Sequence, residues 1–230
     1  MRITNAREMT FDGLVPPHGG SLGLGGLASA RRSLDVVSRL VLSSHGRSWT
    51  VWDFIPGETL EFLVQHGVVS EIVSSYLDRR TTPRSRDAVA NGRIRWREVS
   101  ELMFTGSLSA GSRRLPFWPI RTDGTSDVAI GCNLMSVACP YSGDNVLTVP
   151  AQRLDLAIVT AVAVTEDGNV LRHAEREFLD DADLLLVRAA DNVIVEVEHV
   201  VGSDETSQLE TFASAIDIDL VVVRDPRGGS

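Results

Sequence analysis

Residues 154–164 read LDLAIVTAVAV, and residues 192–200 read NVIVEVEHV. The first stretch is a nearly continuous apolar run, which is typical of a central strand buried on both faces of a sheet. The second is predicted to be another strand, and residues 178–190 between them are predicted to be a helix. Strands that alternate with helices indicate parallel pairing. The sequence therefore predicts an α/β fold, with a largely parallel sheet flanked by helices.

The same alternation extends along the rest of the chain, with no internal repeat, so we expect a single domain over residues 1–230. Pro83 and the neighbouring arginines are interpreted as part of a polar loop. The long stretch 122–145, rich in Gly, Ser and Asp, is interpreted as a loop of the kind that usually exists for function. Further strands are predicted at 21–26, 48–54, 68–77, 93–99, 116–121 and 218–223. Further helices are predicted at 34–41, capped by Ser29 or Ser33, at 58–66, ending at Gly67, and at 100–114 and 203–215. Residues 1–20 and 78–87 are predicted to be irregular.

Composition excludes several classes of function. The net charge of −9 argues against nucleic acid and against anionic membranes as partners, because both require a basic surface. All 22 basic residues are arginine, so a mechanism that uses a Schiff-base lysine and a nucleotide site that uses a P-loop lysine are both excluded. No apolar run approaches the roughly 18 residues of a membrane span, and the N-terminus lacks the apolar segment of a signal peptide. With only Cys132 and Cys139, a disulfide framework and a zinc site are not expected, and we expect a cytoplasmic protein.

Residues 23–28, GLGGLA, fit the G-x-G-x-x-[GA] pattern, and Asp53 ends the next predicted strand, as a ribose-binding acid might. The context does not support dinucleotide binding, because VPPHGGSL precedes the glycines where a buried apolar strand is required. Two interpretations of Gly23, Gly25 and Gly26 stay open. The glycines either permit a tight strand-to-helix turn or let the backbone approach a ligand.

Candidate catalytic groups are few. The five histidines show no metal-ligand spacing and no GxSxG elbow is present, so neither a metal site nor a serine nucleophile is expected. Glu98 and Glu101 lie at the junction of a predicted strand and helix. An acid there is explained by the helix dipole, but Leu-Met-Phe follows Glu101, and a partly buried carboxylate can act as a general base. Arginines at 31–32, 113–114 and 121 are either solvated or bind phosphate or carboxylate groups by forked hydrogen bonds.

Five segments in order resemble the alpha subunit of family I CoA-transferases, and the glutaconate CoA-transferase A-subunit branch in particular. The resemblance covers about residues 10–229 and implies a NagB/RpiA/CoA-transferase-like fold and a beta-subunit partner. The segments are GSLGLGGLASARR (20–32), RLPFWPIR (114–121), VPAQRLDLAIV (149–159), EDGNV (166–170) and ADNVIVEVEHVV (190–201).

This resemblance implies an enzyme subunit that acts on an acyl-CoA, with coenzyme A as part of the substrate and no further cofactor. In transferases of this type the glutamate that forms the thioester belongs to the beta subunit, in a Glu-Asn-Gly or similar setting that is missing here. The branch includes the actinobacterial steroid ring-opening hydrolase, which cleaves a carbon–carbon bond in a cyclic diketone-CoA. Glu101 matches the catalytic glutamate of that hydrolase, where transferases tend to carry Gln. Arg31 matches an arginine of both groups, and Glu198 a common late-strand glutamate.

The resemblance leaves three functions open: CoA transfer, hydrolytic ring opening with Glu101 as base, and a non-catalytic acyl-CoA-binding subunit. For ring opening, backbone N–H groups at the glycine turn are expected to stabilise the leaving enolate. Gly23, Gly25, Gly26 and Arg31 are the expected substrate-binding residues. The chain departs from the family at Arg32, usually lysine, and at Ser33, usually proline. It is also shorter between residues 67 and 92 and at its C-terminal end.

Overall fold

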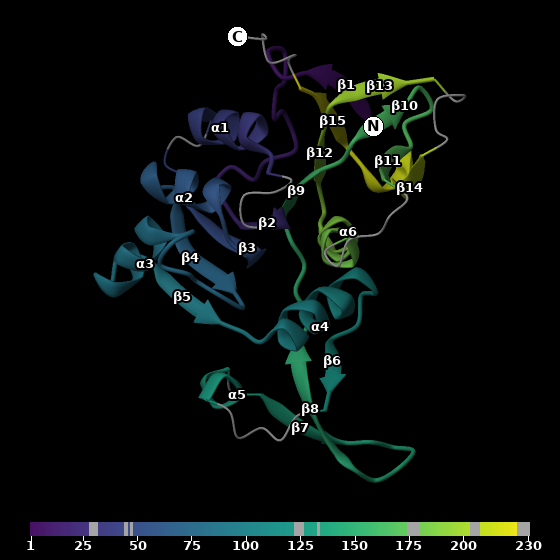
Figure 1. The fold of residues 1–230 in the computed structure, drawn as a ribbon. Coiled ribbons are helices and arrows are strands. Elements are labelled where there is room, and N and C mark those ends of the chain that lie inside the picture. Colours follow the sequence, from purple (N-terminus) through teal and green to yellow (C-terminus); the bar gives the residue numbers. More distant parts are fainter. Residues whose placement is uncertain are drawn as a thin grey trace.

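The computed structural model describes residues 1–27, 32–43, 46, 48–121, 127–132, 134–173, 180–202 and 208–224. Its main element is an eight-stranded sheet in which every adjacent pair of strands is parallel (Figure 1), so the predicted α/β fold with a largely parallel sheet is confirmed. In spatial order the strands are β1 (Arg2–Asn5), β15 (Leu220–Val223), β12 (Val193–Val197), β9 (Leu156–Thr160), β2 (Ser21–Leu27), β3 (Trp49–Ile55), β4 (Val69–Ser74) and β5 (Arg95–Glu98).

Helices cover both faces of this sheet. Side chains alternate between the two faces along each strand, so neighbouring residues of one strand pack against different helices. Val193 and Val195 of β12 pack in the cluster that contains helices α4 and α6, whereas Ile194 between them packs in the cluster that contains α1, α2 and α3. The sheet is thus buried on both sides, as its apolar strands require. The helices are α1 (Leu34–Ser43), α2 (Glu58–Gln65), α3 (Pro83–Ala90), α4 (Glu101–Ser112), the short α5 (Asp127–Gly131), α6 (Asp180–Ala189) and the 3₁₀ turn η1 (Ala215–Asp217).

Two smaller sheets flank the main one. The first lies at the end of the molecule near β1 and β15, and the second projects beyond α4 (Figure 1). The first has the order β13 (His199–Val201), β10 (Ala163–Thr165), β11 (Val170–His173) and β14 (Leu209–Ala213), and the second has the order β6 (Phe117–Ile120), β8 (Asn145–Pro150) and β7 (Met135–Ala138).

The two apolar stretches that predict the fold are each divided between two sheets. Residues 154–164 form β9 in the main sheet and β10 in the four-stranded sheet, and residues 192–200 form β12 and β13 in the same way. The single strands predicted there are therefore wrong in extent. A continuous apolar run shows that backbone is buried, but it does not show where the strand changes its pairing partner.

The helix predicted over residues 203–215 is wrong in its described part, because residues 209–213 form β14. This strand pairs antiparallel with β11, from Val170 with Ala213 to His173 with Leu209. Residues 203–207 lie outside the described residues. Pairing with a distant strand decides the structure of such a short segment, and local propensity does not.

Three stretches predicted as irregular contain regular structure. Pro83 begins α3, where its fixed φ favours the first helical turn, so the polar loop predicted over 78–87 is wrong from that residue on. The loop predicted over 122–145 contains α5 and β7 and ends where β8 begins. Within residues 1–20, β1 pairs with β15. In contrast, β2, β3, α2 and α4 lie where they are predicted, and Gly67 ends α2 with a φ of +68°.

Among the helices that the structure describes, none is long and apolar enough to cross a bilayer.

Candidate functional site

The glycine segment lies at the point where the order of the main sheet changes direction. From β2 the chain builds β3, β4 and β5 on one side, and β9, β12 and β15 on the other. Open parallel sheets bind ligands outside the carboxyl ends of their strands at such a switch point. Gly25 and Gly26 occupy the carboxyl end of β2, and Thr160 ends the neighbouring β9. The topology therefore makes this edge of the sheet the candidate site.

Each of the three glycines has a structural reason to be glycine. A Cβ atom on Gly23 would lie 2.6 Å from Leu154 and 2.9 Å from Leu186, so this residue makes room for core side chains. A Cβ atom on Gly25 would lie 2.8 Å from the Asp183 carboxylate. Gly26 has a φ of +92°, which favours glycine. All three glycines lie within β2, whose register with β3 shifts between Leu24 and Leu27, so they permit a bulge in the strand and the predicted strand-to-helix turn is wrong at these residues. We keep the name glycine turn for the bulged segment Gly25–Gly26, and ligand binding at the three glycines stays a prediction.

A buried aspartate holds the glycine turn from the side of helix α6. The Gly26 amide donates to Asp183 Oδ1 at 3.0 Å, and Arg172 Nη2 of β11 donates to Asp183 Oδ2 at 2.7 Å. Both Asp183 and Arg172 are buried, and Arg172 also donates to the Thr160 carbonyl at the end of β9. Because the Gly26 amide is already bonded within the chain, it is not the free N–H group expected at this turn for a leaving enolate.

A second buried ion pair holds the same turn from the side of β3. Arg32 donates through Nη1 and Nη2 to the two carboxylate oxygens of Asp53, at 2.9 and 3.2 Å, and its Nη1 also donates to the Gly25 carbonyl at 3.0 Å. The Arg32 side chain is 1% exposed and that of Asp53 is fully buried. The solvated or ligand-binding roles considered for Arg32 are therefore wrong. Asp53 binds Arg32 and is not a ribose ligand.

Burial dominates the electrostatics of this pair. Loss of water raises the pKa of Asp53 to about 6, although the charge of Arg32 and its hydrogen bonds lower it, and the nearby Asp183 carboxylate raises it further. Two ion pairs of this kind, one on each side of Gly25 and Gly26, fix the backbone at the carboxyl edge.

Glu196, in β12, extends the buried polar groups to helix α1. Its carboxylate accepts from the Ser33 hydroxyl at 2.6 Å and from the Val36 amide at 3.2 Å, so an acid from the sheet bonds the first turn of α1. Arg224 pairs with the other carboxylate oxygen of Glu196. Ser33 precedes α1 as predicted, but its side chain binds Glu196. The other predicted cap, Ser29, lies outside the described residues.

Glu101 is the first residue of α4, and the preceding Ser100 caps the helix by accepting from the Met103 amide at 3.2 Å. Its side chain is exposed, so the partial burial expected from the following Leu-Met-Phe is not found in this chain. Met103 and Phe104 are buried on the other side of the helix, and Leu102 is 47% exposed. The apolar neighbours therefore anchor the helix without covering the carboxylate.

Strand β3 links Glu101 to the glycine turn. Phe54 packs against Phe104 of α4 with ring centroids 5.3 Å apart, while the adjacent Asp53 binds Arg32. The first turn of α4 and the glycine turn thus both contact the carboxyl end of the same strand. Arg31, the remaining predicted ligand-binding residue, lies outside the described residues.

The other predicted arginines do not join this site. Arg113 and Arg114 follow the C-terminal end of α4, the opposite end from Glu101, and Arg113 stacks over Trp118 with its guanidinium carbon 5.4 Å from the ring centre. Arg121 pairs with Asp144 at 2.8 Å on the surface. The late-strand glutamate Glu198 has a side chain that is 58% exposed, and its Oε1 lies 3.9 Å from Nη1 of Arg224.

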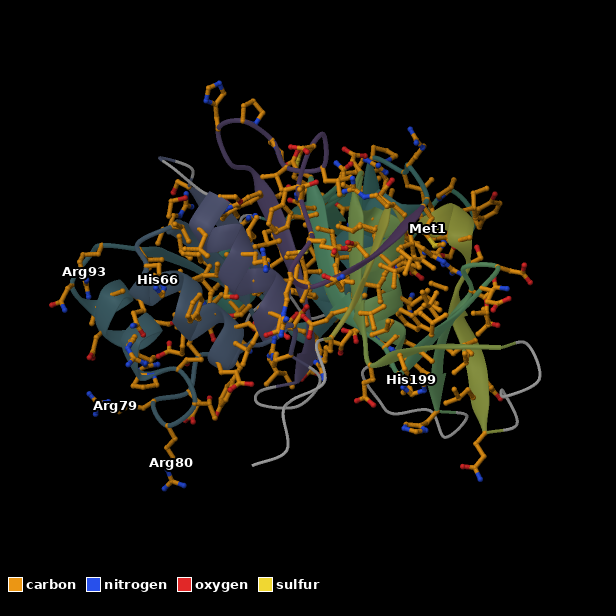
Figure 2. The ribbon with its side chains drawn as sticks, turned by 90° about the horizontal axis from the view of Figure 1, so that it is seen from above. Met1, His66, Arg79, Arg80, Arg93 and His199 are labelled. Carbon is orange, nitrogen blue, oxygen red and sulfur yellow. The ribbon has the colours of Figure 1, made fainter. Side chains whose placement is uncertain are left out.

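No three His, Cys, Asp or Glu side chains within the described ranges are arranged to hold a metal ion. His66 and His199 are both exposed and lie on the left and right sides of the view in Figure 2, and His45 lies outside those ranges. Figure 2 also shows Arg79, Arg80 and Arg93 projecting outwards near α3.

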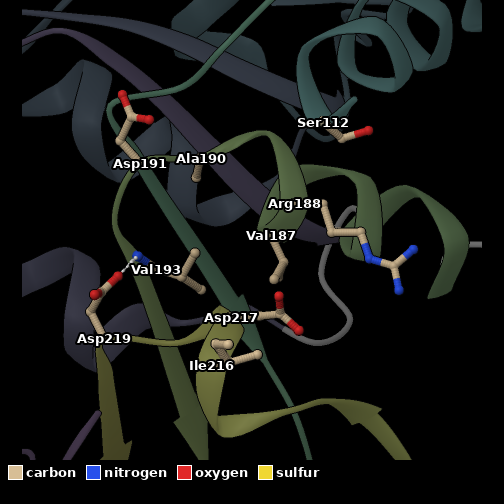
Figure 3. A pocket seen from close by; sticks show the side chains of 9 residues that line it. All are labelled: Ser112, Val187, Arg188, Ala190, Asp191, Val193, Ile216, Asp217 and Asp219. Atoms are coloured by element: carbon tan, nitrogen blue, oxygen red, sulfur yellow. Dashed lines mark hydrogen bonds between the residues drawn. The ribbon is translucent and has the colours of Figure 1, made fainter. Parts of the chain in front are cut away.

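A cavity of about 400 Å³ lies at the other edge of the sheet (Figure 3). Val193 begins β12 and Asp219 directly precedes β15, so these residues mark the amino edge. Asp219 accepts from the Val193 amide at 2.8 Å. Three aspartates and one arginine give this cavity an acidic lining, which disfavours the phosphates of a nucleotide. The lining is Ser112, Val187, Arg188, Ala190, Asp191, Val193, Ile216, Asp217 and Asp219.

Sequence reasoning did not find Asp183, Arg172 or Glu196. Signals for two of them exist in the local pattern. Asp183 lies three and four residues before the buried Leu186 and Val187, on the same face of α6, and Glu196 interrupts the apolar strand VIVEV. An acid on an apolar face indicates a buried partner.

Comparison with known proteins gives a consistent result. The family model described as Coenzyme A transferase matches residues 20–224. The chain is 31% identical to the cholesterol ring-cleaving hydrolase IpdA subunit of Rhodococcus jostii over 201 residues, 81% of this chain and 65% of that one. It is 32% identical to a 3-oxoadipate CoA-transferase subunit of Pseudomonas knackmussii over 122 residues, 51% of this chain and 42% of that one. The chain thus spans less than two thirds of the length of these curated relatives.

A solved structure shows the same fold. The crystal structure of glutaconate coenzyme A-transferase from Acidaminococcus fermentans superposes with a TM-score of 0.80 at 19% identity, over 97% of this chain and 75% of that one.

Proposed function

We propose, because the chain belongs to the coenzyme A transferase family, that it is the alpha-type subunit of a heteromeric enzyme acting on an acyl-CoA. The reaction favoured here is hydrolytic cleavage of a carbon–carbon bond in a cyclic diketone-CoA, with Glu101 as the general base. Residues 1–230 would act as one domain of this subunit, and its partner would be a beta subunit. A cytoplasmic location is part of the proposal.

The observation that carries this proposal is the uncommitted carboxylate of Glu101. The described part of the chain provides no hydrogen bond or ion pair to its side chain, whereas buried acids such as Glu61 and Glu196 are bonded to backbone amides and hydroxyls. Glu101 also lies at a helix N-terminus, which favours negative charge. An exposed carboxylate that has no partner among the described residues is suited to accept a proton from water.

The proposed step balances as follows. Glu101 accepts a proton from a water molecule while the water oxygen forms a bond to one ring carbonyl carbon of the diketone. The bond between that carbon and the carbon between the two carbonyls then breaks. Its electron pair passes into the second carbonyl, which gives a carboxylic acid and an enolate. Glu101 returns the proton to the enolate carbon, so the products are an acid and a ketone in an opened ring.

The predicted substrate-binding residues adjoin this chemistry in the proposal. The backbone at Gly23, Gly25 and Gly26, together with Arg31, would contact the acyl-CoA, and coenzyme A would enter only as part of the substrate. The fixed geometry of Gly25 and Gly26 supports such a role, since preorganised backbone loses little freedom on binding. The Gly26 amide is bonded to Asp183, so it would not stabilise the enolate.

CoA transfer is the second candidate, and the relative named a 3-oxoadipate CoA-transferase favours it. In that case a glutamate of the beta subunit would form the thioester, and Glu101 would only line the site. A third candidate is a non-catalytic acyl-CoA-binding subunit that keeps the fold, in which no reaction would depend on Glu101.

The test is co-expression with a beta-type subunit of the same family, followed by assays on a panel of acyl-CoA thioesters with and without a carboxylate acceptor. Glu101→Gln keeps the shape of the side chain but removes the base, so it should lower kcat for hydrolysis by about 10²–10⁴-fold. The matched control is Glu98→Gln, which replaces an exposed acid at the end of β5 and should have little effect on kcat. Acceptor-dependent activity that tolerates Glu101→Gln would instead identify the transferase, and a complex that binds acyl-CoA without turnover would identify the binding subunit.

A further inference from the structure

The three-stranded sheet has one buried face and one apolar face that is largely exposed among the described residues. Residue register places Trp118, Ile120, Leu147 and Val149 on one face, where they pack in the core cluster that contains α4. Side chains alternate along a strand, so the neighbouring residues point away from α4. This outer face consists of Phe117, Pro119, Met135, Val137, Val146 and Pro150, with Thr148 as its one polar member.

Several residues of the outer face are strongly exposed. Met135 is 75% exposed, Phe117 40% and Val137 39%. Every residue of β7 is exposed, and β7 is an edge strand that pairs with β8 alone among the described strands. In Figure 1 this sheet projects from the body of the molecule, below α4. Contiguous exposed apolar surface on a protruding sheet indicates a surface that another protein covers.

The outer face is connected to the proposed catalytic residue through α5. Cys132, just after this helix, donates to the Glu98 carbonyl at 3.4 Å, three residues before Glu101. Ile130 on α5 is 63% exposed and Leu102, beside Glu101, is 47% exposed. Exposed apolar side chains therefore occur both next to Glu101 and on the segment that leads from it to β7.

We propose that the outer face of the three-stranded sheet, Phe117–Ile120, Met135–Ala138 and Asn145–Pro150, is the docking surface for the second subunit, which also covers Glu101. This inference rests on the proposed function, because a hydrolase base that is exposed in its own chain needs another chain to exclude bulk water. One partner that seats on the sheet and extends over α5 would cover both.

Charge distinguishes this partner from a second copy of the chain. The three strands carry no charged residue, while exposed Arg113 and Arg114 border the start of β6. The expected partner surface is therefore apolar with carboxylates at its rim. A second copy would place the same two arginines at the rim and would bring together two chains of net charge −9.

The experiment uses the complex of this chain with the proposed beta-type subunit. The variant Met135→Glu/Val137→Glu puts two charges on the outer face and should weaken heteromer formation at least about tenfold, since charge is poorly tolerated in the centre of an interface. The control is Ile216→Glu, which places a charge on a more exposed apolar residue (92%) of η1 and should leave the affinity unchanged. Hydrogen exchange on the unaltered chain should show protection of the amides of residues 135–138 on assembly.

The outcomes separate this inference from the function. Weaker assembly of the double variant only, with protection of β7 in the unaltered complex, supports the docking surface. An active complex in which the double variant assembles as tightly as the unaltered chain, and β7 exchanges at its free rate, overturns the docking surface and leaves the function intact. If the unaltered chain fails to associate with the second subunit, both the docking surface and the proposed function are wrong. If the double variant instead loses a homodimer, the occupant is a second copy and the inference is wrong.

Discussion

Asp183 of helix α6 accepts the backbone N–H of Gly26 at 3.0 Å, across the switch point of the main sheet. Its other oxygen binds Arg172 of β11, so a single carboxylate joins the glycine turn, a helix and a strand of the neighbouring sheet. On the opposite side of the turn Arg32 donates to the Gly25 carbonyl. The candidate site is therefore built on backbone that two separate ion pairs hold in position.

Replacing Asp183 should destabilise the fold strongly. Asp183→Ala leaves Arg172 without its buried carboxylate and the Gly26 amide without its acceptor, and breaking a buried pair in this way costs about 3–5 kcal/mol. Equilibrium denaturation measures this loss. Asp181→Ala, two residues earlier on the exposed side of α6, is the control, and equal losses for the two variants would contradict the role of Asp183.

A methyl group at Gly25 should displace the turn. The new Cβ would lie 2.8 Å from Asp183 Oδ1 and 2.9 Å from Val159, so one of these neighbours must move. We expect Gly25→Ala to lower the free energy of unfolding by about 1–3 kcal/mol and to weaken acyl-CoA binding to the assembled enzyme. Gly202→Ala has open space around it and serves as the comparison. Unchanged stability and affinity of Gly25→Ala would show that the turn adapts freely.

The pH dependence of stability should carry a contribution from Asp53. Burial raises its pKa from 3.8 to about 6, so between these values the folded protein holds a proton that the unfolded chain releases. The stabilising contribution is thus fully present below about pH 4 and is lost as the pH rises through 6. Carboxyl ¹³C NMR, with the resonance assigned by its absence in Asp53→Asn, measures the titration directly. A midpoint below 3.8 would mean that Arg32 outweighs burial.

The two adjacent arginines should behave differently on replacement. Arg31→Ala should weaken acyl-CoA binding by about 1.5–3 kcal/mol, the value of a hydrogen bond to a charged group. Arg32→Ala should lower stability, because Asp53 and the Gly25 carbonyl both lose their buried donor. Calorimetry on the assembled complex and denaturation of each variant separate the two effects. An unchanged dissociation constant for Arg31→Ala would make that residue an ordinary surface arginine.

The fold follows from patterns that the sequence displays locally. Buried strands such as β9 and β12 are largely apolar runs, and α2 is followed by a glycine with positive φ, so both kinds of element are predictable. The resemblance to the coenzyme A transferase family, drawn from five segments in order, is confirmed over residues 20–224. What local pattern does not contain is the identity of the pairing partner, which is why β10, β13 and β14 are missed.

The site is less predictable than the fold for the same reason. Arg32 and Asp53 are separated by 21 residues and Gly26 and Asp183 by 157, and no spacing rule joins such pairs. Arg32 is therefore interpreted from sequence as a surface or ligand-binding residue, although its fork binds a partner within the chain. The exposure of Glu101 is missed because the neighbouring Met103 and Phe104 are buried on the opposite face of the helix.

The pairing of β1 with β15 has a consequence for how the protein folds. Arg2 of β1 pairs with Leu220 of β15, so β1 cannot form this pairing until β15 has been synthesised. Among the described strands β15 is the one neighbour of β1 in the sheet, so β1 stays unpaired while the segments between them are synthesised. Contacts between such distant segments slow folding. This edge of the main sheet can consequently form only after β15 has been translated.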